Sequence, residues 1–304
     1  MELVYSDRYN IDIGEHPWSP RKYEETLRML REMTPESTWS ISNAPMAEDE
    51  DILRVHSFEF WRKLNDIDFM EEEERILELP ITAGLIDLFW RMAGGTALAT
   101  ETALKEGLCV HIGGGFHHAY PDYGAGFCLI NDIAVSVRSV QEKGLAERIA
   151  IIDCDVHQGD GTAWIFKDEP NVITFSIHQL RNFPRIKRSS SIDIDMEDAT
   201  GDAHYLAMLR DGLGQVAAYG PFDLVHYQAG ADPYSKDTLG GLALTTEGLQ
   251  RRDSMVLDWA ATQNAPAIVT LGGGYTETIQ DVARIHANTI LAAVKASKQF
   301  VGHQ

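Results

Sequence analysis

The sequence predicts an α/β protein with a mostly parallel central sheet flanked by helices. Three observations lead to this prediction. Short apolar runs recur after residue 107, most of them precede a segment with helical periodicity, and polar residues follow where the runs end. Continuous apolar strands that alternate with helices are typical of a parallel sheet covered on both faces. No linker or repeat divides the chain, so we expect one domain over residues 1–304.

The first hundred residues are expected to be mostly helical. Ser19 and Pro20 form a typical helix start, an N-cap followed by a proline at the first helical position. That helix is predicted to run through residues 22–33. Further helices are predicted over residues 57–66 and from about 84 to 106.

Five apolar runs in the rest of the chain are predicted to be strands. They lie at residues 108–112, 148–154, 172–177, 223–229 and 267–271. Helical periodicity follows the first run at residues 131–144 and the fourth at residues 245–261. These alternations supply the strands and the covering helices of the predicted sheet.

Composition narrows the classes of function. Hydrophobic residues make up 44% of the chain and charged residues 24%, which is enough for a sizeable core. The net charge of −20, from 26 basic and 46 acidic side chains, excludes direct nucleic-acid binding and favours cationic ligands. We expect a soluble cytoplasmic protein, because no apolar stretch reaches the ~20 residues of a membrane span and the amino terminus lacks signal-peptide features. The oligomeric state is left open.

The three cysteines are expected to be free core residues. Cys109, Cys128 and Cys154 each lie in an apolar run, and no CxxC spacing occurs. A disulfide framework or a cysteine zinc site is therefore not expected.

Polar residues end or follow all five predicted strands. They are His117 and His118, then Asp153, Asp155 and His157, then Ser176 and His178, then Asp232, and finally Gly272, Gly273, Gly274 and Tyr275. Open parallel sheets place their ligand crevice at the carboxyl edge of the strands. These scattered segments are therefore expected to converge on one site.

Asp155, His157 and Asp232 are candidate zinc ligands. In an extended chain, residues 153, 155 and 157 project to the same side, so two carboxylates and an imidazole would lie together. Two such carboxylates repel each other unless a cation neutralises them. Three protein ligands leave a fourth position open for water, as in catalytic zinc sites.

The adjacent His117 and His118 are candidate acid–base catalysts. They follow the glycines of residues 113–115, and two imidazoles beside a metal-bound water can act as general base and general acid. Asp153 and Asp160 are the expected carboxylate partners of the two rings.

Tyr275 is a candidate oxyanion donor, because its phenol lies on a glycine-rich loop and could bond to a metal-bound carbonyl. Glycine-rich loops also bind phosphates, but neither GxGxxG nor a Walker lysine is present, which excludes that interpretation.

The blocks GGGFHHA (113–119), GFCLIND (126–132), DCDVHQGDGT (153–162), AGADPY (229–234) and LGGGY (271–275) resemble the signatures of the classical zinc-dependent histone deacetylases. Their order and spacing match across nearly the whole chain. The segments YNIDIG, HPWSPRKY, AGGTALA and ARIHANTI look most like the class IV branch and the bacterial histone deacetylase-like amidohydrolases. The resemblance implies the arginase/deacetylase fold and a single catalytic domain.

The resemblance also implies residue roles. It implies that Asp155, His157 and Asp232 bind zinc and that Tyr275 stabilises the oxyanion. It implies that His117 and His118 act as acid–base catalysts, with Asp153 and Asp160 as their partners. The implied substrate-binding residues are Phe127 and Phe183 as channel walls, Leu239 at the rim, and Gly126 and Gly273. A potassium site is implied at Asp153, Asp155, His157, Ser176 and Ile177, and a second one near Phe166, Glu169 and Val172.

Two departures from the class I pattern concern the entrance. The acidic residue that grips the substrate backbone in class I has only Glu78 as a counterpart. The segment after Phe183 and Pro184 lacks the PGTG loop of class I. Substrate choice is therefore expected to differ from that of class I.

The predicted function is zinc-dependent hydrolysis of N-acyl-lysine, acetyl or longer, in proteins or peptides. The alternative enzymatic function is deacylation of an acetylpolyamine or another small acylated amine. The excess of acidic side chains suits such a cationic substrate. An arginase-like binuclear manganese enzyme is disfavoured, because DVHQGDG lacks the extra aspartate of that branch. A catalytically inactive metal-bound scaffold is disfavoured too, because it would be expected to lose a ligand, a histidine or Tyr275. Iron in place of zinc stays open.

Overall fold

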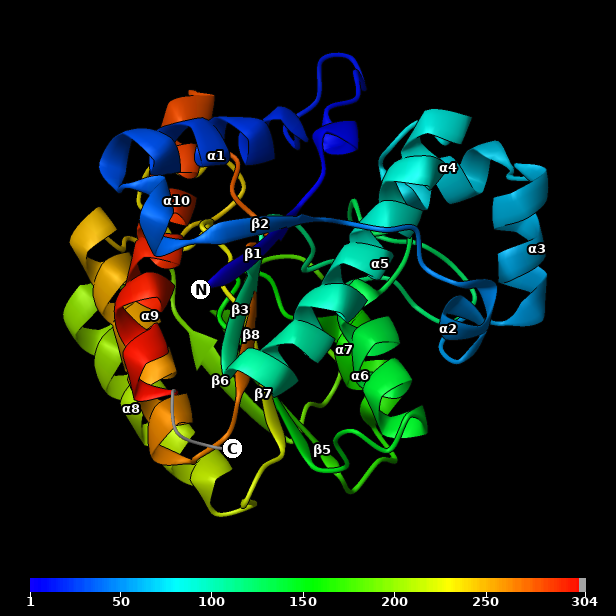
Figure 1. The fold of residues 1–304 in the computed structure, drawn as a ribbon. Coiled ribbons are helices and arrows are strands. Elements are labelled where there is room, and N and C mark those ends of the chain that lie inside the picture. The colour runs from blue at the N-terminus through cyan, green and yellow to red at the C-terminus, as the bar shows by residue number, and fades with distance from the viewer. Residues whose placement is uncertain (301–304) are drawn as a thin grey trace.

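The computed structural model describes residues 1–300 and contains one eight-stranded sheet in which every neighbouring pair is parallel (Figure 1). Its strand order is β2-β1-β3-β8-β7-β4-β5-β6. The strands are β1 (Glu2–Tyr5), β2 (Ser40–Asn43), β3 (Leu108–His111), β4 (Ile149–Asp153), β5 (Val172–Gln179), β6 (Ile192–Met196), β7 (Leu224–Gln228) and β8 (Ala267–Thr270). The predicted fold class is confirmed.

The five strands predicted from apolar runs form the centre of the sheet. Every residue of β3, β4, β5, β7 and β8 is buried. Strands covered on both faces cannot alternate apolar and polar side chains, which explains their continuous apolar character. The three cysteines are free and buried, as expected.

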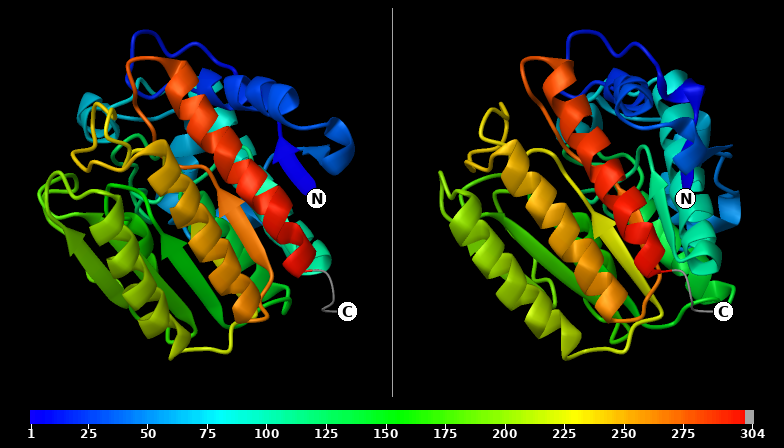
Figure 2. Two further views of the ribbon diagram at one scale, coloured as in Figure 1. Left: turned by 90° about the vertical axis from the view of Figure 1, so that its left-hand side faces the viewer. Right: turned by 60° about the vertical axis from the view of Figure 1, so that its left-hand side comes forward.

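Helices cover both faces of the sheet (Figure 2). They are α1 (Arg21–Met33), α2 (Asp49–Leu53), α3 (Phe58–Asp66), α4 (Glu71–Leu77), α5 (Ala83–Glu106), α6 (Asp132–Glu142), α7 (Asp160–Phe166), α8 (Asp202–Ala217), α9 (Thr246–Thr262) and α10 (Ile279–Ala296), with short 3-10 turns at Asp7–Tyr9, Glu36–Thr38 and Ser297–Gln299. Helices α8, α9 and α10 lie side by side on one face, and α5, α6 and α7 lie on the other. No helix among residues 1–300 combines the length and the apolar character needed to cross a membrane.

The amino-terminal hundred residues are less uniformly helical than predicted. They contribute β1 and β2 at one edge of the sheet, and both strands are only four residues long. The residues of β2 are exposed or half-buried, so this strand lacks the continuous apolar run of the central strands. The first helix also begins later than predicted, at Arg21, with Pro20 as its cap.

Strand β6, at the opposite edge, was missed as well. It alternates buried isoleucine and methionine with exposed aspartate, the period-two pattern of a half-covered edge strand. It pairs in parallel with β5, yet the connection over residues 180–191 contains no helix. Its alternation of apolar and charged residues contains no continuous apolar run, so it was not predicted.

Candidate active site

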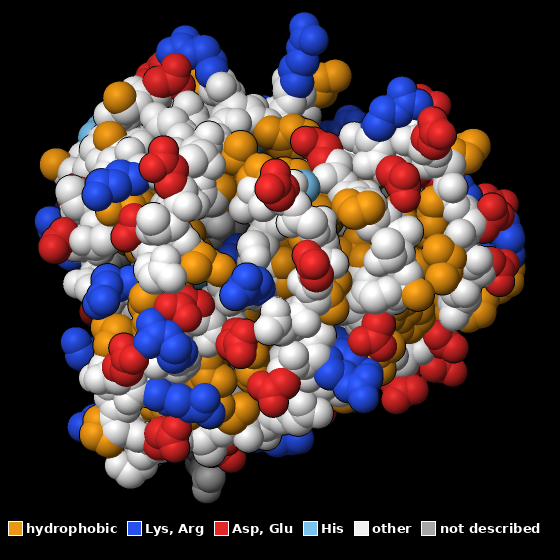
Figure 3. All heavy atoms as spheres, turned by 90° about the horizontal axis from the view of Figure 1, so that it is seen from above, with side chains coloured by type: hydrophobic (Ala, Val, Ile, Leu, Met, Phe, Trp, Pro, Cys, Tyr) orange, Lys and Arg blue, Asp and Glu red, His pale blue; other side chains and the backbone are white. Residues whose placement is uncertain are grey.

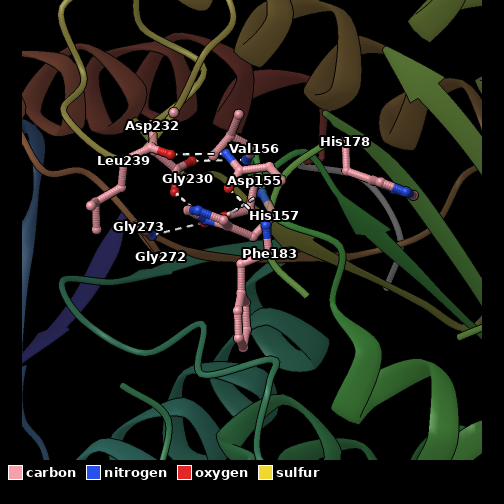
Figure 4. Close-up of polar contacts among 12 residues, drawn as sticks. Asp155, Val156, His157, His178, Phe183, Gly230, Asp232, Leu239, Gly272 and Gly273 are labelled. Atoms are coloured by element: carbon pink, nitrogen blue, oxygen red, sulfur yellow. Dashed lines mark hydrogen bonds and ion pairs between the residues drawn. The ribbon is translucent and has the colours of Figure 1, made fainter. Parts of the chain in front are cut away.

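Four of the five central strands deliver candidate residues to one edge of the sheet. β3 leads to the histidine pair, β4 to Asp155 and His157, β7 to Asp232 and β8 to Tyr275. β4 and β7 are neighbours although about seventy residues separate them in the chain. Figure 4 shows Asp155, His157 and Asp232 gathered together, whereas His178 points away from them.

Asp155, His157 and Asp232 form a site that fits a metal cation. Their ligand atoms lie within 4.8 Å of one another, and all three side chains are buried. His157 Nδ1 lies 3.1 Å from Asp155 Oδ1 and 3.2 Å from Asp232 Oδ2. One ring N–H cannot satisfy both carboxylates, and Asp232 Oδ2 has no hydrogen-bond partner within the described chain. A cation bound by the three side chains would satisfy this buried oxygen.

Backbone N–H groups fix the two carboxylates in place. Asp155 Oδ2 accepts a hydrogen bond of 3.0 Å from Gly273 N–H, and Asp232 Oδ1 accepts one of 2.9 Å from Val156 N–H. A Cβ at Gly273 would overlap the Asp232 carboxylate, so this position has to be glycine. These bonds tie the ends of β4, β7 and β8 together around the candidate ligands.

The charges of the three residues show how strongly the site favours a positive partner. Burial alone would lower the pKa of His157, but its contacts with Asp155 and Asp232 outweigh burial and raise that pKa to about 10. Burial and the neighbouring Asp155 raise the pKa of Asp232 to about 7. Two carboxylates in this dry environment are stable only beside a proton or a metal ion.

His117 and His118 form a hydrogen-bonded pair. His117 Nδ1 lies 2.6 Å from Asp153 Oδ2, and His118 Nδ1 lies 2.7 Å from Asp160 Oδ1. The two Nε2 atoms are 3.0 Å apart, so one ring donates to the other. Because each Nδ1 donates to a carboxylate, one ring carries both protons and the other carries one. The pair therefore contains one acid and one base.

The surroundings of the two rings differ. Burial would lower the pKa of His117, but the negative charges of Asp153 and Asp155 raise it to about 9. Burial and the adjacent His117 lower the pKa of His118 to about 4, in spite of Asp160. These surroundings favour the extra proton on His117 over His118.

A narrow cavity leads from the surface to these groups. Its volume is about 170 Å³, and its lining includes Glu78, His118, Gly126, Phe127, His157, Asn182, Phe183, Leu239 and Tyr275. The Phe183 ring meets the His118 ring edge-on at 4.8 Å, and Phe127 faces Tyr275 at 5.8 Å. A Cβ at Gly126 would lie 2.6 Å from the Phe183 ring, and its φ of 50° also favours glycine.

The sequence-predicted residues thus fall into two groups. The candidate ligands, the histidine pair with its carboxylates, Tyr275 and the channel residues come together around the cavity. Ser176 and Ile177 lie on β5, where Ser176 pairs in register with Asp153. The Ser176 hydroxyl lies 2.9 Å from His178 Nδ1, away from the cavity.

The surface above the site is mixed in charge. Seen from above, Lys and Arg side chains are scattered among Asp and Glu on this face rather than gathered in one patch (Figure 3). The exposed Glu78 lies at the channel mouth, at the carboxyl end of α4. Glu78 is therefore an acidic group that a ligand meets at the mouth.

The histidine pair, the triad and the tyrosine loop all lie within a region that matches one family model, the histone deacetylase domain, over residues 16–292. The chain belongs to the histone deacetylase family.

Several relatives of this histone deacetylase-family hydrolase cover most of its length. It is 43% identical to an uncharacterised protein of Picosynechococcus sp. over 214 residues, which are 70% of this chain and 71% of that protein. It is 30% identical to the acetoin utilization protein AcuC of Bacillus subtilis, covering 80% of this chain and 69% of the relative. It is 28% identical to histone deacetylase 2 of Arabidopsis thaliana, over 95% of this chain and 78% of that relative.

Two residues of the histone deacetylase-family site were not found from the sequence because they act on backbone atoms. Asp237 Oδ2 accepts from Tyr275 N–H at 2.7 Å, and its Oδ1 accepts from Leu239 N–H at 2.9 Å. The buried Lys22 donates at 2.7 Å to the carbonyl of Gly272. Asp237 lies outside the segments that carry the family resemblance, and Lys22 lies in HPWSPRKY without a role implied for it. Contacts from a side chain to the backbone of a distant segment leave no local pattern.

Two further polar residues complete the surroundings of the site. Tyr120 donates to Asp160 Oδ2 at 2.9 Å, so both oxygens of this carboxylate are engaged. Gln228 donates at 3.0 Å to the carbonyl of Gly115, just before the histidine pair. A polar residue at the end of the predicted strand 223–229 was the only sequence signal for Gln228.

Phe183 provides a test of the channel. Phe183→Ala should lower kcat/KM without a large loss of thermal stability, because this ring is half-exposed at the cavity. Phe175→Ala is the matched control, since the Phe175 ring is buried in β5 and its truncation should cost about 3–5 kcal/mol. Melting temperatures and steady-state kinetics on an acylated peptide measure both effects. Equal destabilisation by the two variants would show that Phe183 is a core residue instead.

Proposed function

We propose that this chain hydrolyses N-acyl-lysine, acetyl or longer, in proteins or peptides, in a zinc-dependent reaction carried by one catalytic domain over residues 1–304. The observation that carries the proposal is the open three-residue triad at the end of a narrow channel, with the rings of His118 and Tyr275 at 6.0 Å and 6.2 Å from that of His157. Only a slender chain with its reactive group at the tip fits such a channel.

Asp155, His157 and Asp232 would hold the zinc ion. Zinc bound there would supply a Lewis acid that polarises the amide carbonyl and lowers the pKa of a water molecule. The buried, unpartnered oxygen of Asp232 and the carboxylate–imidazole–carboxylate donor set fit this ion. Iron would use the same donors.

The histidine pair would move the protons. The neutral ring accepts the proton of the attacking water, and the protonated ring supplies a proton for the leaving amine. Asp153 and Asp160 orient the two rings through their Nδ1 atoms. Hydrolysis then requires no proton from bulk solvent during one turnover.

Tyr275 would stabilise the oxyanion that develops on the carbonyl oxygen. Burial and the carboxylates of Asp232 and Asp155 raise the pKa of Tyr275 well above its usual value, so the phenol keeps its proton and can donate. Asp237 and Lys22 fix the loop that carries this side chain. The hydroxyl therefore acts from a preorganised position.

We include potassium in the proposal, at Asp153, Asp155, His157, Ser176 and Ile177. The parallel register sets Asp153, the last residue of β4, beside Ser176 within β5, so oxygen atoms of two neighbouring strands are available to a cation there.

A small acylated amine is the second candidate substrate. The exposed Glu78 at the channel mouth and the net charge of −20 favour a ligand with a further cationic group. An acetylated polyamine has such a group about one lysine length from its amide. Both candidates use the same bond cleavage.

The first test of the proposal concerns the metal. Asp155→Ala removes one of three ligands, so the variant should lose the bound ion and its activity while it stays folded. Metal content by elemental analysis, circular dichroism and an acyl-lysine assay measure these effects. Asp258→Ala, which removes an exposed carboxylate on α9, is the control and should keep both metal and activity. Full metal occupancy in Asp155→Ala would contradict the ligand assignment.

Tyr275→Phe tests the oxyanion role. The substitution removes only the hydroxyl, so metal content and melting temperature should remain at wild-type values. Turnover should fall by ~10²–10³, the usual effect of losing one oxyanion donor. A kcat near that of the wild type on the best substrate would refute the role.

A substrate panel tests the choice of acyl amine. Peptides carrying acetyl-, octanoyl- and myristoyl-lysine should be hydrolysed with a higher kcat/KM than acetylputrescine. Both kinds of substrate place the same methylene chain in the channel, but only a peptide has a backbone that can contact rim residues such as Leu239. Release of free amine measures each rate. Preference for acetylputrescine would favour the small-amine alternative, and activity on acetyl-lysine alone would exclude long acyl chains.

A further inference from the structure

Arg252 lies directly behind the candidate metal site and has no part in the chemistry described above. It belongs to α9, and its side chain is fully buried. Its Nη1 donates to the carbonyl of Gly230 at 2.6 Å and to the carbonyl of Cys154 at 3.3 Å. A charged donor makes stronger hydrogen bonds than a neutral one.

The two carbonyls belong to the strand ends that carry the candidate ligands. Cys154 follows β4 and immediately precedes Asp155, and Gly230 follows β7 two residues before Asp232. One nitrogen atom therefore joins both segments at the point where they approach the metal position. Gly230 is also packed so closely on Asp155 that a Cβ there would overlap the carboxylate. Movement of Gly230 would displace a ligand directly.

Arg252 is held by its neighbour Asp253, and Asp253 is held by residues of β7 and α10. Its Nε lies 2.9 Å and its Nη2 2.8 Å from Asp253 Oδ1. Asp253 also accepts hydrogen bonds of 2.6 Å from the Tyr227 hydroxyl of β7 and the Thr289 hydroxyl of α10. This ion pair is buried, and buried pairs often add little net stability over apolar side chains. A role other than stability accounts better for its position.

We propose that Arg252 is a positioning residue that sets the metal affinity of the site. It fixes the distance between the β4 ligands, Asp155 and His157, and the β7 ligand, Asp232, against the mutual repulsion of the two carboxylates. The proposal rests on the metal site put forward under the proposed function. Groups that orient metal ligands typically change metal affinity by ~10–100-fold when they are removed.

The main test is Arg252→Lys, which keeps the charge but replaces the planar guanidinium by a single nitrogen on a different stem. Thr289→Val is the matched control, because it removes a hydrogen bond to Asp253 and leaves both carbonyl contacts in place. Zinc dissociation constants of the apo proteins, from competition with a chromophoric chelator, are compared with their melting temperatures. Arg252→Lys should bind zinc ~10–100-fold more weakly. Thr289→Val should bind it as the wild type does, even if it melts earlier.

Excess zinc should restore most of the activity of Arg252→Lys, with KM unchanged, because Arg252 does not line the channel. If Arg252→Lys does not fold, the double variant Arg252→Met with Asp253→Asn removes both charges and leaves no lone buried ion. The same comparison with Thr289→Val then applies to it.

Zinc binding by the arginine variants as tight as that of Thr289→Val would overturn the role of Arg252 and leave the proposed function intact. Equal weakening by Thr289→Val and Arg252→Lys would also overturn it, because affinity would then only follow fold stability. A wild-type protein that binds no divalent ion would overturn the metal site and this inference together.

Discussion

The close approach of two buried carboxylates, Asp155 and Asp232, is the constraint on which the rest of the site depends. In a dry crevice their repulsion is large, and desolvation disfavours both negative charges. The structure compensates with directed donors, namely the backbone N–H groups of Val156 and Gly273 and the ring of His157, which bonds to Asp155. These donors leave one Asp232 oxygen unsatisfied, so the compensation is incomplete without a cation.

The parallel sheet makes this arrangement possible. Its strand order places β4 beside β7, so ligands from distant parts of the chain meet at one edge. Helices on both faces exclude water from the strands, and the carboxyl ends remain open to the channel. The same strand order places β8 between β3 and β7, so the loops that carry the histidine pair and Tyr275 also reach the triad. The rings of His118 and Tyr275 lie 6.0 Å and 6.2 Å from the ring of His157.

The sequence predicted the central strands and the candidate triad because both leave local signals, apolar runs and polar residues at their ends. It did not predict β1 and β2. β2 is an edge strand whose residues are exposed or half-buried, and β1, although it lies inside the sheet, has an apolar run of only three residues, Leu3, Val4 and Tyr5. β6 carried a signal, the alternation of its apolar residues, which a search for continuous runs passes over. Asp237 and Arg252 could not be found in this way. Each binds backbone atoms of a segment that is remote from it in the sequence. Such contacts depend on the tertiary fold.

Asp237 links the entrance of the channel to its chemistry. One of its oxygens holds the backbone of Tyr275, and the other holds the backbone of Leu239 and of Gly240. The rim segment and the loop of Tyr275 are therefore attached to the same carboxylate, through bonds of 2.7–2.9 Å. A substrate group that displaces the rim would pull on Asp237 and so on the loop of Tyr275. With Tyr275 in its proposed role, such contacts remote from the amide would contribute to turnover as well as to affinity.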